Sequence, residues 1–218
     1  EDLKMSQPRM MAVLDPVKLV IDNYEEGKIE YLDVPNNQEN PELGTRKVPF
    51  GRELYIERED FKIDPPRKYF RLFPGNEVRL MSACTGYETD EDGNVTVVHA
   101  TYDPETKSGS GFTGRKVKGT IHWVAADTAA KAEVRLYENI VDEEKGVYNE
   151  DGSINVNPNS LTILKECYME PALKEAKPGD KFQFMRTGFF CVDTKDTTAE
   201  HMVFNRIVSL KSSYRPNK

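Results

Sequence analysis

Gln183 lies in the short stretch Phe182-Gln183-Phe184, in which aromatic and polar residues alternate. Successive side chains of a β-strand point to opposite faces, so the two phenylalanines would face a core and Gln183 the other side. A side-chain amide both donates and accepts hydrogen bonds, which suits the base-pairing edge of an unstacked uracil. An ordinary surface glutamine is the alternative. Arg186, three residues later, adds a nearby cation.

Two arginines flank a turn. Arg71 and Arg79 lie on either side of Pro74-Gly75, so the turn could direct both toward one groove. The planar guanidinium group bonds guanine edges or phosphates in pairs. Strand arginines held in ion pairs are the alternative, above all for Arg79. Phe70, beside Arg71, could offer a stacking face to a splayed base, an interaction worth about 1–3 kcal/mol.

Arg9 follows Pro8 and precedes the apolar run 10–14, so its guanidinium group would project where the chain enters its first strand. On spacing alone, an exposed arginine that contributes little is the better interpretation. The loop 35–41 is rich in side-chain amides and includes Asn40. Asparagines that form turns are the ordinary explanation for such a loop.

Residues 115–124 place three cations on a β-like stretch that contains the only tryptophan of the chain. In a strand, Lys116 and Lys118 would share one face. As phosphate contacts they would add affinity without specificity, and a solvated face is the alternative. His122 and Trp123 are expected to pack in the core.

The overall charge is acidic. The 218 residues carry a formal net charge of −7 with a pI near 5.2, which argues against nucleic acid at first sight because phosphate binding depends on basic surface. Net charge averages over the whole surface, however, and an acidic protein can present a local basic groove. Cations gather within residues 67–79 and again in 205–218.

No stretch approaches the ~20 apolar residues of a membrane helix, and residues 1–4 do not resemble a secretory leader. We therefore expect a cytoplasmic protein without a membrane partner. The three cysteines are far apart, so neither a disulfide framework nor a zinc site is expected.

Motifs for catalysis are missing. The three histidines are far apart in sequence, and the usual hydrolase, phosphate-loop and dinucleotide-binding motifs do not occur. Asp193, Asp196, Glu200 and His201 cluster in one loop and could hold a divalent metal. Such a run is more often a solvated turn, so we expect neither a metal site nor a catalytic residue.

Glycine and proline recur throughout, 14 and 13 times, and most apolar runs are short, which is typical of an all-β protein. Short helices are plausible over residues 127–131 and 170–176, and Asp92-Gly93 predicts a hairpin. Strands are expected at 18–21, 28–32, 53–56, 77–81, 95–102, 116–123, 133–137, 160–164, 181–184, 188–192 and 203–210. Polar stretches at 61–66 and 142–158 indicate crossings between two units, the middle one inserted in the outer one.

Several of these segments occur together in one order. They are the run from Arg9 through Met-Met-Ala-Val-Leu-Asp-Pro-Val-Lys-Leu-Val, the stretch 115–124, Phe182-Gln-Phe, and Thr198-Ala-Glu-His-Met-Val-Phe-Asn-Arg. In this combination the chain resembles the C-terminal anticodon-binding region of glutaminyl-tRNA synthetases, of bacterial type. The resemblance implies two β-barrels of the ribosomal-protein-L25-like type, with a distal barrel (67–146) inserted in a proximal one (8–66 and 147–218).

The resemblance also implies what the chain does. The family is class I ligases that attach glutamine to tRNA(Gln) with ATP, and magnesium is expected with the catalytic domain. The His-Ile-Gly-His and Lys-Met-Ser-Lys motifs of that domain are absent here, so the chain is expected to be an inactive fragment without a cofactor of its own. Its partners would be the anticodon loop of tRNA(Gln) and its own catalytic domain. A monomer is expected.

Individual roles follow from the same resemblance. Arg9 and Gln183 would share the middle uridine, Arg71 would read the third-position guanine, and Arg79 the first base. Arg186 matches a further cation of the family.

The sequence departs from the bacterial pattern near the third- and first-base positions, with Phe70 and Met81 where relatives have lysine and arginine. Asn40 belongs to the asparagine-bearing loop that contributes to the third base in the family.

Three alternatives stay open. One is the anticodon-binding region of a eukaryotic-type glutamyl-tRNA synthetase, which shares the fold. Another is a stand-alone RNA-binding protein of the same fold. The third is a metal-dependent enzyme that uses the loop 193–201.

Overall fold

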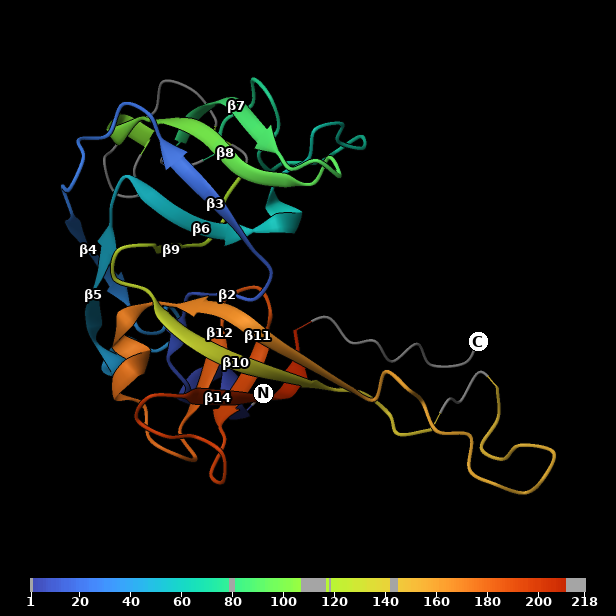
Figure 1. Ribbon diagram of the computed structural model, residues 1–218. Helices are drawn as coiled ribbons and strands as arrows, with labels where there is room; N and C mark the ends of the chain where they lie inside the picture. Colours follow the sequence, from blue (N-terminus) through green and yellow to red (C-terminus); the bar gives the residue numbers. More distant parts are fainter. Residues whose placement is uncertain (1, 79–80, 107–116, 118, 142–144, 211–218) are drawn as a thin grey trace.

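The computed structural model describes residues 2–78, 81–106, 117, 119–141 and 145–210. The predicted binding residues Arg79, Lys116 and Lys118 lie outside this part of the chain. Within it, strands dominate and form two main sheets, one above the other in Figure 1. The all-β prediction is confirmed.

The lower sheet closes on itself. In spatial order its strands are β1 (Arg9–Met10), β12 (Lys181–Phe184), β13 (Gly188–Val192), β14 (Met202–Ser209), β10 (Ala130–Tyr137), β11 (Leu161–Met169) and β2 (Ala12–Val13). The two edge strands, β1 and β2, are separated in the chain only by Met11. The edges of the sheet therefore meet at one residue, and the sheet forms a barrel, which leaves few backbone groups without a partner.

The upper sheet is built from the chain that runs between β2 and β10. Its spatial order is β7 (Met81–Thr89), β8 (Val95–Tyr102), β3 (Pro16–Ile21), β6 (Glu53–Glu57) and β9 (Trp123–Ala125). One barrel is thus interrupted by a second unit, as the resemblance implies. The inserted unit begins near Pro16 and ends near Ala125.

The strand pairing differs from the division at 66/67 and 146/147 that we expected. β3 and β6, expected in the proximal barrel, pair with β8 and β9, expected in the distal one. β10, expected in the distal barrel, pairs with β11 and β14. The polar stretches 61–66 and 145–158 are loops within single units. Polar composition indicates contact with water and does not mark a change of unit.

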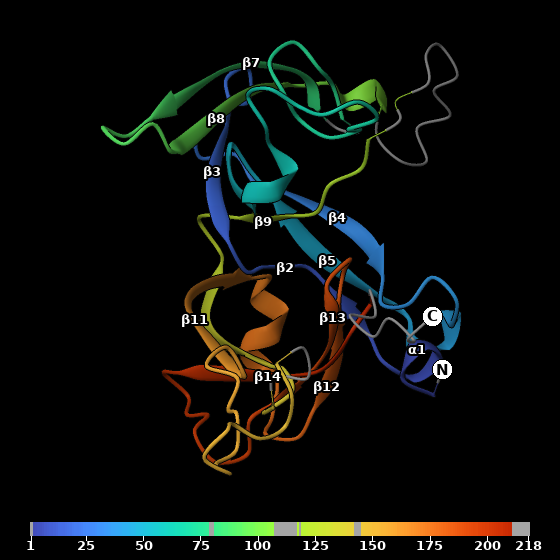
Figure 2. The same ribbon diagram turned by 90° about the vertical axis from the view of Figure 1, so that its right-hand side faces the viewer.

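A hairpin joins the two units. β4 (Glu30–Pro35) and β5 (Thr45–Phe50) pair with each other and extend from the upper unit down to the N-terminal segment (Figure 2). The short helices are α1 (Asp2–Ser6), η1 (Pro41–Leu43) at the tip of this hairpin, η2 (Arg58–Asp60), η3 (Pro104–Thr106) and η4 (Pro171–Glu175).

Three apolar clusters hold the molecule together. The inserted unit is packed around Leu19, Phe50 and Leu54, and the barrel around Phe184 and Phe190, whose rings stack at 4.3 Å. A third cluster lies between the two units and consists of Met11, Val13, Val48 and Val124. Burial of this third cluster favours a fixed arrangement of the units.

Local predictions fared unequally. β8, β12 and β13 have the predicted bounds, and the hairpin at Asp92-Gly93 is confirmed, with Gly93 at a φ of 82°. The predicted helix at 127–131 is wrong: a turn leads directly into β10, whose Ala130 and Ala132 face the core. The helix at 170–176 is present as the 3₁₀ turn η4. Of the strand expected at 116–123, residues 116 and 118 lie outside the described part of the chain, and among the described residues Trp123 belongs to β9.

Residues 138–141 and 145–160 extend away from the barrel between β10 and β11 (Figure 1). This arm carries exposed apolar side chains, with Ile140 69%, Tyr148 68% and Val156 57% exposed. The bridges Val141–Val156 and Tyr148–Ile154 connect its two sides. None of the described helices has the length and apolar character needed to span a membrane.

Candidate nucleic-acid interface

Arg9 and Gln183 lie side by side although 174 positions separate them in the sequence. β1 and β12 are parallel, and Arg9 is the direct partner of Gln183 in their register. Paired residues of neighbouring strands project to the same face of a sheet. The closure of the barrel at Met11 brings the two side chains together. No local sequence pattern shows this.

Gln183 is buried and Arg9 is mostly buried, and both keep unused hydrogen-bonding atoms. Gln183 is 9% exposed and the Arg9 side chain 16% exposed. The Nε of Arg9 and the Oε1 of Gln183 have no hydrogen-bond partner among the residues that the structure describes. Buried polar atoms are nearly always paired, so an unused donor and an unused acceptor on two partnered strand residues favour this pair as a ligand site. The interpretation of Gln183 as an ordinary surface residue, and of Arg9 as an exposed one, does not fit this burial.

Glu39 holds the other end of the Arg9 side chain. Its Oε1 accepts a hydrogen bond from Nη2 of Arg9 at 2.8 Å, and its Oε2 lies 2.9 Å from Nζ of Lys4. The hydrogen bonds from Arg9 and Lys4 keep the pKa of the Glu39 carboxyl below its usual range. Glu39 belongs to the loop that sequence analysis singled out for its asparagines.

The asparagines of this loop bond to backbone groups of the loop and of the N-terminal segment. Asn40 caps η1, since its side chain accepts from the backbone N–H of Glu42 and donates to the carbonyl of Met5. Asn37 is buried and donates to the carbonyls of Lys4 and Gln7. The turn-forming interpretation of Asn40 therefore accounts for its contacts, and the loop still lies next to Arg9.

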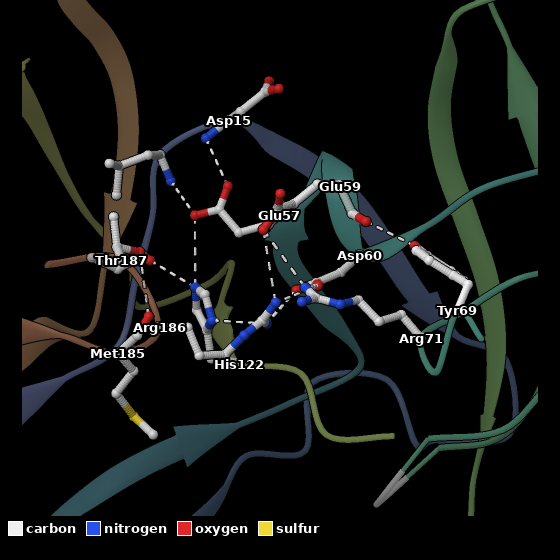
Figure 3. Close-up of polar contacts among 12 residues, drawn as sticks. Asp15, Glu57, Glu59, Asp60, Tyr69, Arg71, His122, Met185, Arg186 and Thr187 are labelled. Carbon is white, nitrogen blue, oxygen red and sulfur yellow. Dashed lines mark hydrogen bonds and ion pairs between the residues drawn. The ribbon is translucent and has the colours of Figure 1, made fainter. Parts of the chain in front are cut away.

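A buried carboxylate brings Arg71 and Arg186 together (Figure 3). Asp60, at the end of η2, is fully buried and accepts hydrogen bonds from Nη1 and Nη2 of Arg186, each at 2.7 Å, and from Nη1 of Arg71. Burial raises the pKa of the Asp60 carboxyl, and the hydrogen bonds from Arg186 oppose that rise. Asp60 and Arg71 come from the inserted unit and Arg186 from the barrel, so this cluster connects the two.

His122 and Glu57 continue the connection between the units. Nε2 of His122 donates to the carbonyl of Ala12 at 2.8 Å, while Nδ1 lies 3.3 Å from Nη1 of Arg186. A carbonyl only accepts and a guanidinium group only donates, so this arrangement places the ring proton on Nε2. Glu57 accepts the backbone N–H groups of Leu14 and Asp15 (Figure 3). The expectation that His122 and Trp123 pack inside is confirmed.

A polar hollow of about 230 Å³ lies beside this cluster. Glu57, Glu59, His122 and Arg186 line it together with two further residues. It therefore presents both a cation and carboxylates at the junction of the units.

The segment that carries Phe70 and Arg71 packs tightly against Gly119. Phe70 is 50% exposed, which leaves its ring accessible for stacking. A Cβ atom on Gly119 would lie 2.4 Å from the carbonyl oxygen of Phe70 and 2.8 Å from a methyl group of Val78. Only glycine permits this approach.

An arginine from a neighbouring strand pairs with the acidic loop 193–201. Arg135 lies on β10, and its Nη1 is 2.6 Å from Oδ2 of Asp196 and 3.8 Å from Oδ2 of Asp193. Across the described residues, no group of three or more potential ligands could hold a metal ion. The arginine supplies the positive charge that a cation would bring.

Two further titratable groups have shifted pKa values. The hydrogen bond to Asp22 raises the pKa of His99 on β8, and its partial burial opposes the rise. Burial raises the pKa of the Cys167 thiol to about 12. Cys84 is buried as well, whereas Cys191 is partly exposed, and all three are free thiols.

The amino-acid sequence alone did not indicate the buried acidic residues of this region. Asp60, Glu57 and Glu170 are buried and accept hydrogen bonds across the units, yet Glu57 and Asp60 belong to a charged run, residues 57–60, and Glu170 precedes a proline at the start of a short helix. A weak signal was present. Glu57 ends an apolar strand segment and Glu170 directly follows one, and a carboxylate is not needed for solubility at either position.

Comparison with known proteins identifies the region. The family model for the anti-codon binding domain of class I tRNA synthetases (E and Q) matches residues 7–103, and a second model with the same description matches residues 120–193. The glutamine–tRNA ligase of Clostridium perfringens is 55% identical over 99% of this chain, and that of Clostridioides difficile is 55% identical over all of it. The ligase of Aliivibrio salmonicida is 49% identical over 98%. The chain spans about 40% of the length of these relatives.

Proposed function

Because the chain belongs to the anticodon-binding family of class I glutamyl- and glutaminyl-tRNA synthetases, we propose that it reads the anticodon of tRNA(Gln) as part of a glutamine–tRNA ligase. The observation that carries this proposal is the pair of Arg9 and Gln183, buried side by side with an unused donor and an unused acceptor. Relatives that share half or more of the sequence are glutamine–tRNA ligases, which favours glutamine over glutamate.

The chemistry of this pair suits uridine at the middle position. The base-pairing edge of uracil presents one donor, N3–H, between two acceptor oxygens. Oε1 of Gln183 can accept from N3–H, and Nε of Arg9 can donate to a neighbouring oxygen. Cytosine has an acceptor at N3, so it would face the Gln183 oxygen with a second acceptor. Such a mismatch leaves buried polar groups unpaired and costs about 1–3 kcal/mol.

Arg71 and Arg186 support reading of a neighbouring base. Their guanidinium groups both bond to Asp60. Arg186 lies three residues after Gln183 in the chain. We propose Arg71 for the third-position guanine, with Phe70 as a stacking surface. Arg79 for the first base and phosphate contacts by Lys116 and Lys118 are proposed from the family resemblance alone.

The remaining steps belong to the parts of the relatives that this chain does not match. We propose that ATP and magnesium act there and that this chain has no catalytic residue of its own. The exposed apolar arm, residues 138–141 and 145–160, supports attachment of the chain to the rest of such an enzyme, since apolar patches of this kind commonly mark interaction surfaces. We propose a monomer that works in the cytoplasm.

Binding to anticodon stem-loop RNAs tests the proposal. One RNA carries the glutamine anticodon and the others carry single-base changes at each of its three positions. The 218-residue chain should bind the glutamine stem-loop more tightly than the RNA with cytosine in the middle, by about 1–3 kcal/mol. Equal affinity for all stem-loops would contradict the proposal. Salt dependence, measured in parallel, reports the phosphate contacts separately.

A further inference from the structure

We propose that Arg46 and Glu170 are positioning residues that hold Arg9 in the orientation in which it reads the middle base. This inference rests on the proposed function. Arg46 bonds to the Arg9 carbonyl and to the loop that carries Glu39, and Glu170 bonds to Arg46 and to the N–H of Met11.

Arg9 needs such support because β1 is a two-residue strand at the edge of its sheet. The neighbouring strand β12 bonds to the residues before and after Arg9: the N–H of Gln183 donates to Pro8 and that of Met185 to Met10. The N–H and carbonyl of Arg9 itself point away from β12. In a parallel sheet they would pair with the next strand, which is missing here.

Arg46 and the loop take the place of that strand. The N–H of Arg9 donates to the carbonyl of Asn36 at 2.6 Å, and the carbonyl of Arg9 accepts from Nη2 of Arg46 at 2.8 Å. Nη1 of Arg46 also donates to the side chain of Asn36 at 3.1 Å. One guanidinium group therefore fixes both the Arg9 backbone and the start of the loop whose Glu39 pairs with the Arg9 side chain.

Glu170 fixes Arg46 and the next residue of the chain. Its carboxylate accepts from Nε of Arg46 at 2.6 Å and from Nη2 at 2.7 Å, and its Oε1 accepts from the N–H of Met11 at 2.5 Å. In return, the backbone N–H of Glu170 donates to the carbonyl of Met11 at 3.1 Å. The Arg46 and Glu170 side chains are only 10% and 2% exposed. Forked hydrogen bonds between charged groups in such an environment are strong and directional.

The Arg46–Glu170 ion pair does more than stabilise the fold. A buried ion pair contributes little net stability compared with well-packed apolar residues of similar size, so stability alone gives no reason to retain it. What apolar residues could not supply is the hydrogen bond to the Arg9 carbonyl. Loss of that bond would let the edge strand shift, and the Arg9 side chain would lose its alignment with Gln183.

The test compares affinities for stem-loops with uridine or cytosine at the middle position, and takes their ratio as the discrimination. The double variant Arg46→Met/Glu170→Gln removes both charges, and its glutamine oxygen can still accept from Met11. We expect its folding stability to stay near that of the wild type, while middle-base discrimination falls about tenfold. Discrimination at the first and third positions should not change.

Arg46→Lys gives a second measurement that does not depend on the double variant being folded. Lysine keeps the charge beside Glu170, but its single ammonium group cannot reproduce the fork that reaches Glu170 and the Arg9 carbonyl together. Middle-base discrimination should again fall, with stability close to the wild type. The matched control is Arg135→Met/Glu133→Gln, an ion pair of 2.7 Å on β10 of the same barrel, with side chains 20% and 11% exposed. It should leave discrimination unchanged.

The possible outcomes distinguish failure of the proposed function from failure of the positioning role. If the wild-type chain does not prefer uridine, the proposed function fails. If the wild type prefers uridine and the Arg46 and Glu170 variants keep its ratio, the positioning role fails and the pair is structural only. The positioning role also fails if the control pair lowers the ratio as much, because the loss would then be a general effect of weakening the barrel.

Discussion

Replacement of Asp60 by asparagine should destabilise the protein and loosen the junction between its two units. The Asp60 carboxylate is fully buried and receives hydrogen bonds from Arg71 and Arg186. Asparagine has nearly the same shape, but it offers one acceptor oxygen and turns an N–H₂ donor toward guanidinium groups, which can only donate.

The structure sets the size of this effect. Removal of one partner from a buried ion pair costs about 3–5 kcal/mol when the other stays buried. Here the partners are 29% and 28% exposed, so both guanidinium groups can turn toward water. We therefore expect the free energy of unfolding to fall by about 2–3 kcal/mol, at or below the lower end of that range. With a urea m-value of about 3 kcal/mol/M, the unfolding midpoint should fall by about 0.7–1 M.

Urea titration followed by tryptophan fluorescence is a suitable assay, because the only tryptophan, Trp123, packs at the edge of the core of the inserted unit, close to the junction. Asp33→Asn is the matched control. Asp33 is 66% exposed and pairs with Lys47, 62% exposed, at 2.8 Å, so the same substitution should cost less than about 1 kcal/mol. A midpoint for Asp60→Asn within error of that for Asp33→Asn would refute the view that Asp60 joins the two units.

Three further outcomes follow from the described contacts. Gly119→Ala should destabilise by about 1–3 kcal/mol in the same titration, because its Cβ would overlap a backbone carbonyl, whereas Gly86→Ala, with no atom near its Cβ, should cost far less. In the folded protein a thiol reagent should modify Cys191 long before Cys167, whose burial raises its pKa to about 12, and equal rates would contradict the buried position. The pKa of His99 is higher in the folded protein than its unfolded value of about 6.5. Protonated His99 therefore contributes fully to folding stability below the unfolded pKa, and this contribution disappears as pH rises through the folded pKa. The variant His99→Gln should accordingly be less stable than the wild type at about pH 5 and equally stable at about pH 9.

The strands of the barrel were predictable because their signals are local. Alternation in Phe182-Gln183-Phe184 and the following turn gave the bounds of β12 and β13 correctly. Glycine at a positive φ closed the hairpin at Asp92-Gly93 as predicted. Local sequence could not show which strands share a sheet, since pairing depends on contacts between distant segments. For that reason, the strand pairing differs from the expected division at 66/67 and 146/147.

The candidate site was only partly predictable for a similar reason. Arg9 looks like an exposed arginine by spacing, and its burial results from closure of the barrel at Met11, beside Gln183. The resemblance to a family pointed to both residues, but it gave no indication of Asp60, Arg46 or Glu170. Their partners lie 126 and 124 positions away in the sequence, a separation at which charge patterns carry no information.

The most direct test of the account uses the N3 position of the middle uridine. Stem-loops with uridine or N3-methyluridine there are bound to the wild-type chain and to Gln183→Ala, and the two affinities are compared for each protein. The wild type should prefer uridine by about 1–3 kcal/mol, since methylation removes the donor for Oε1 of Gln183, and Gln183→Ala should lose most of this preference. Equal binding of both RNAs by the wild type, or an undiminished preference in Gln183→Ala, would contradict the claim that Gln183 reads this base.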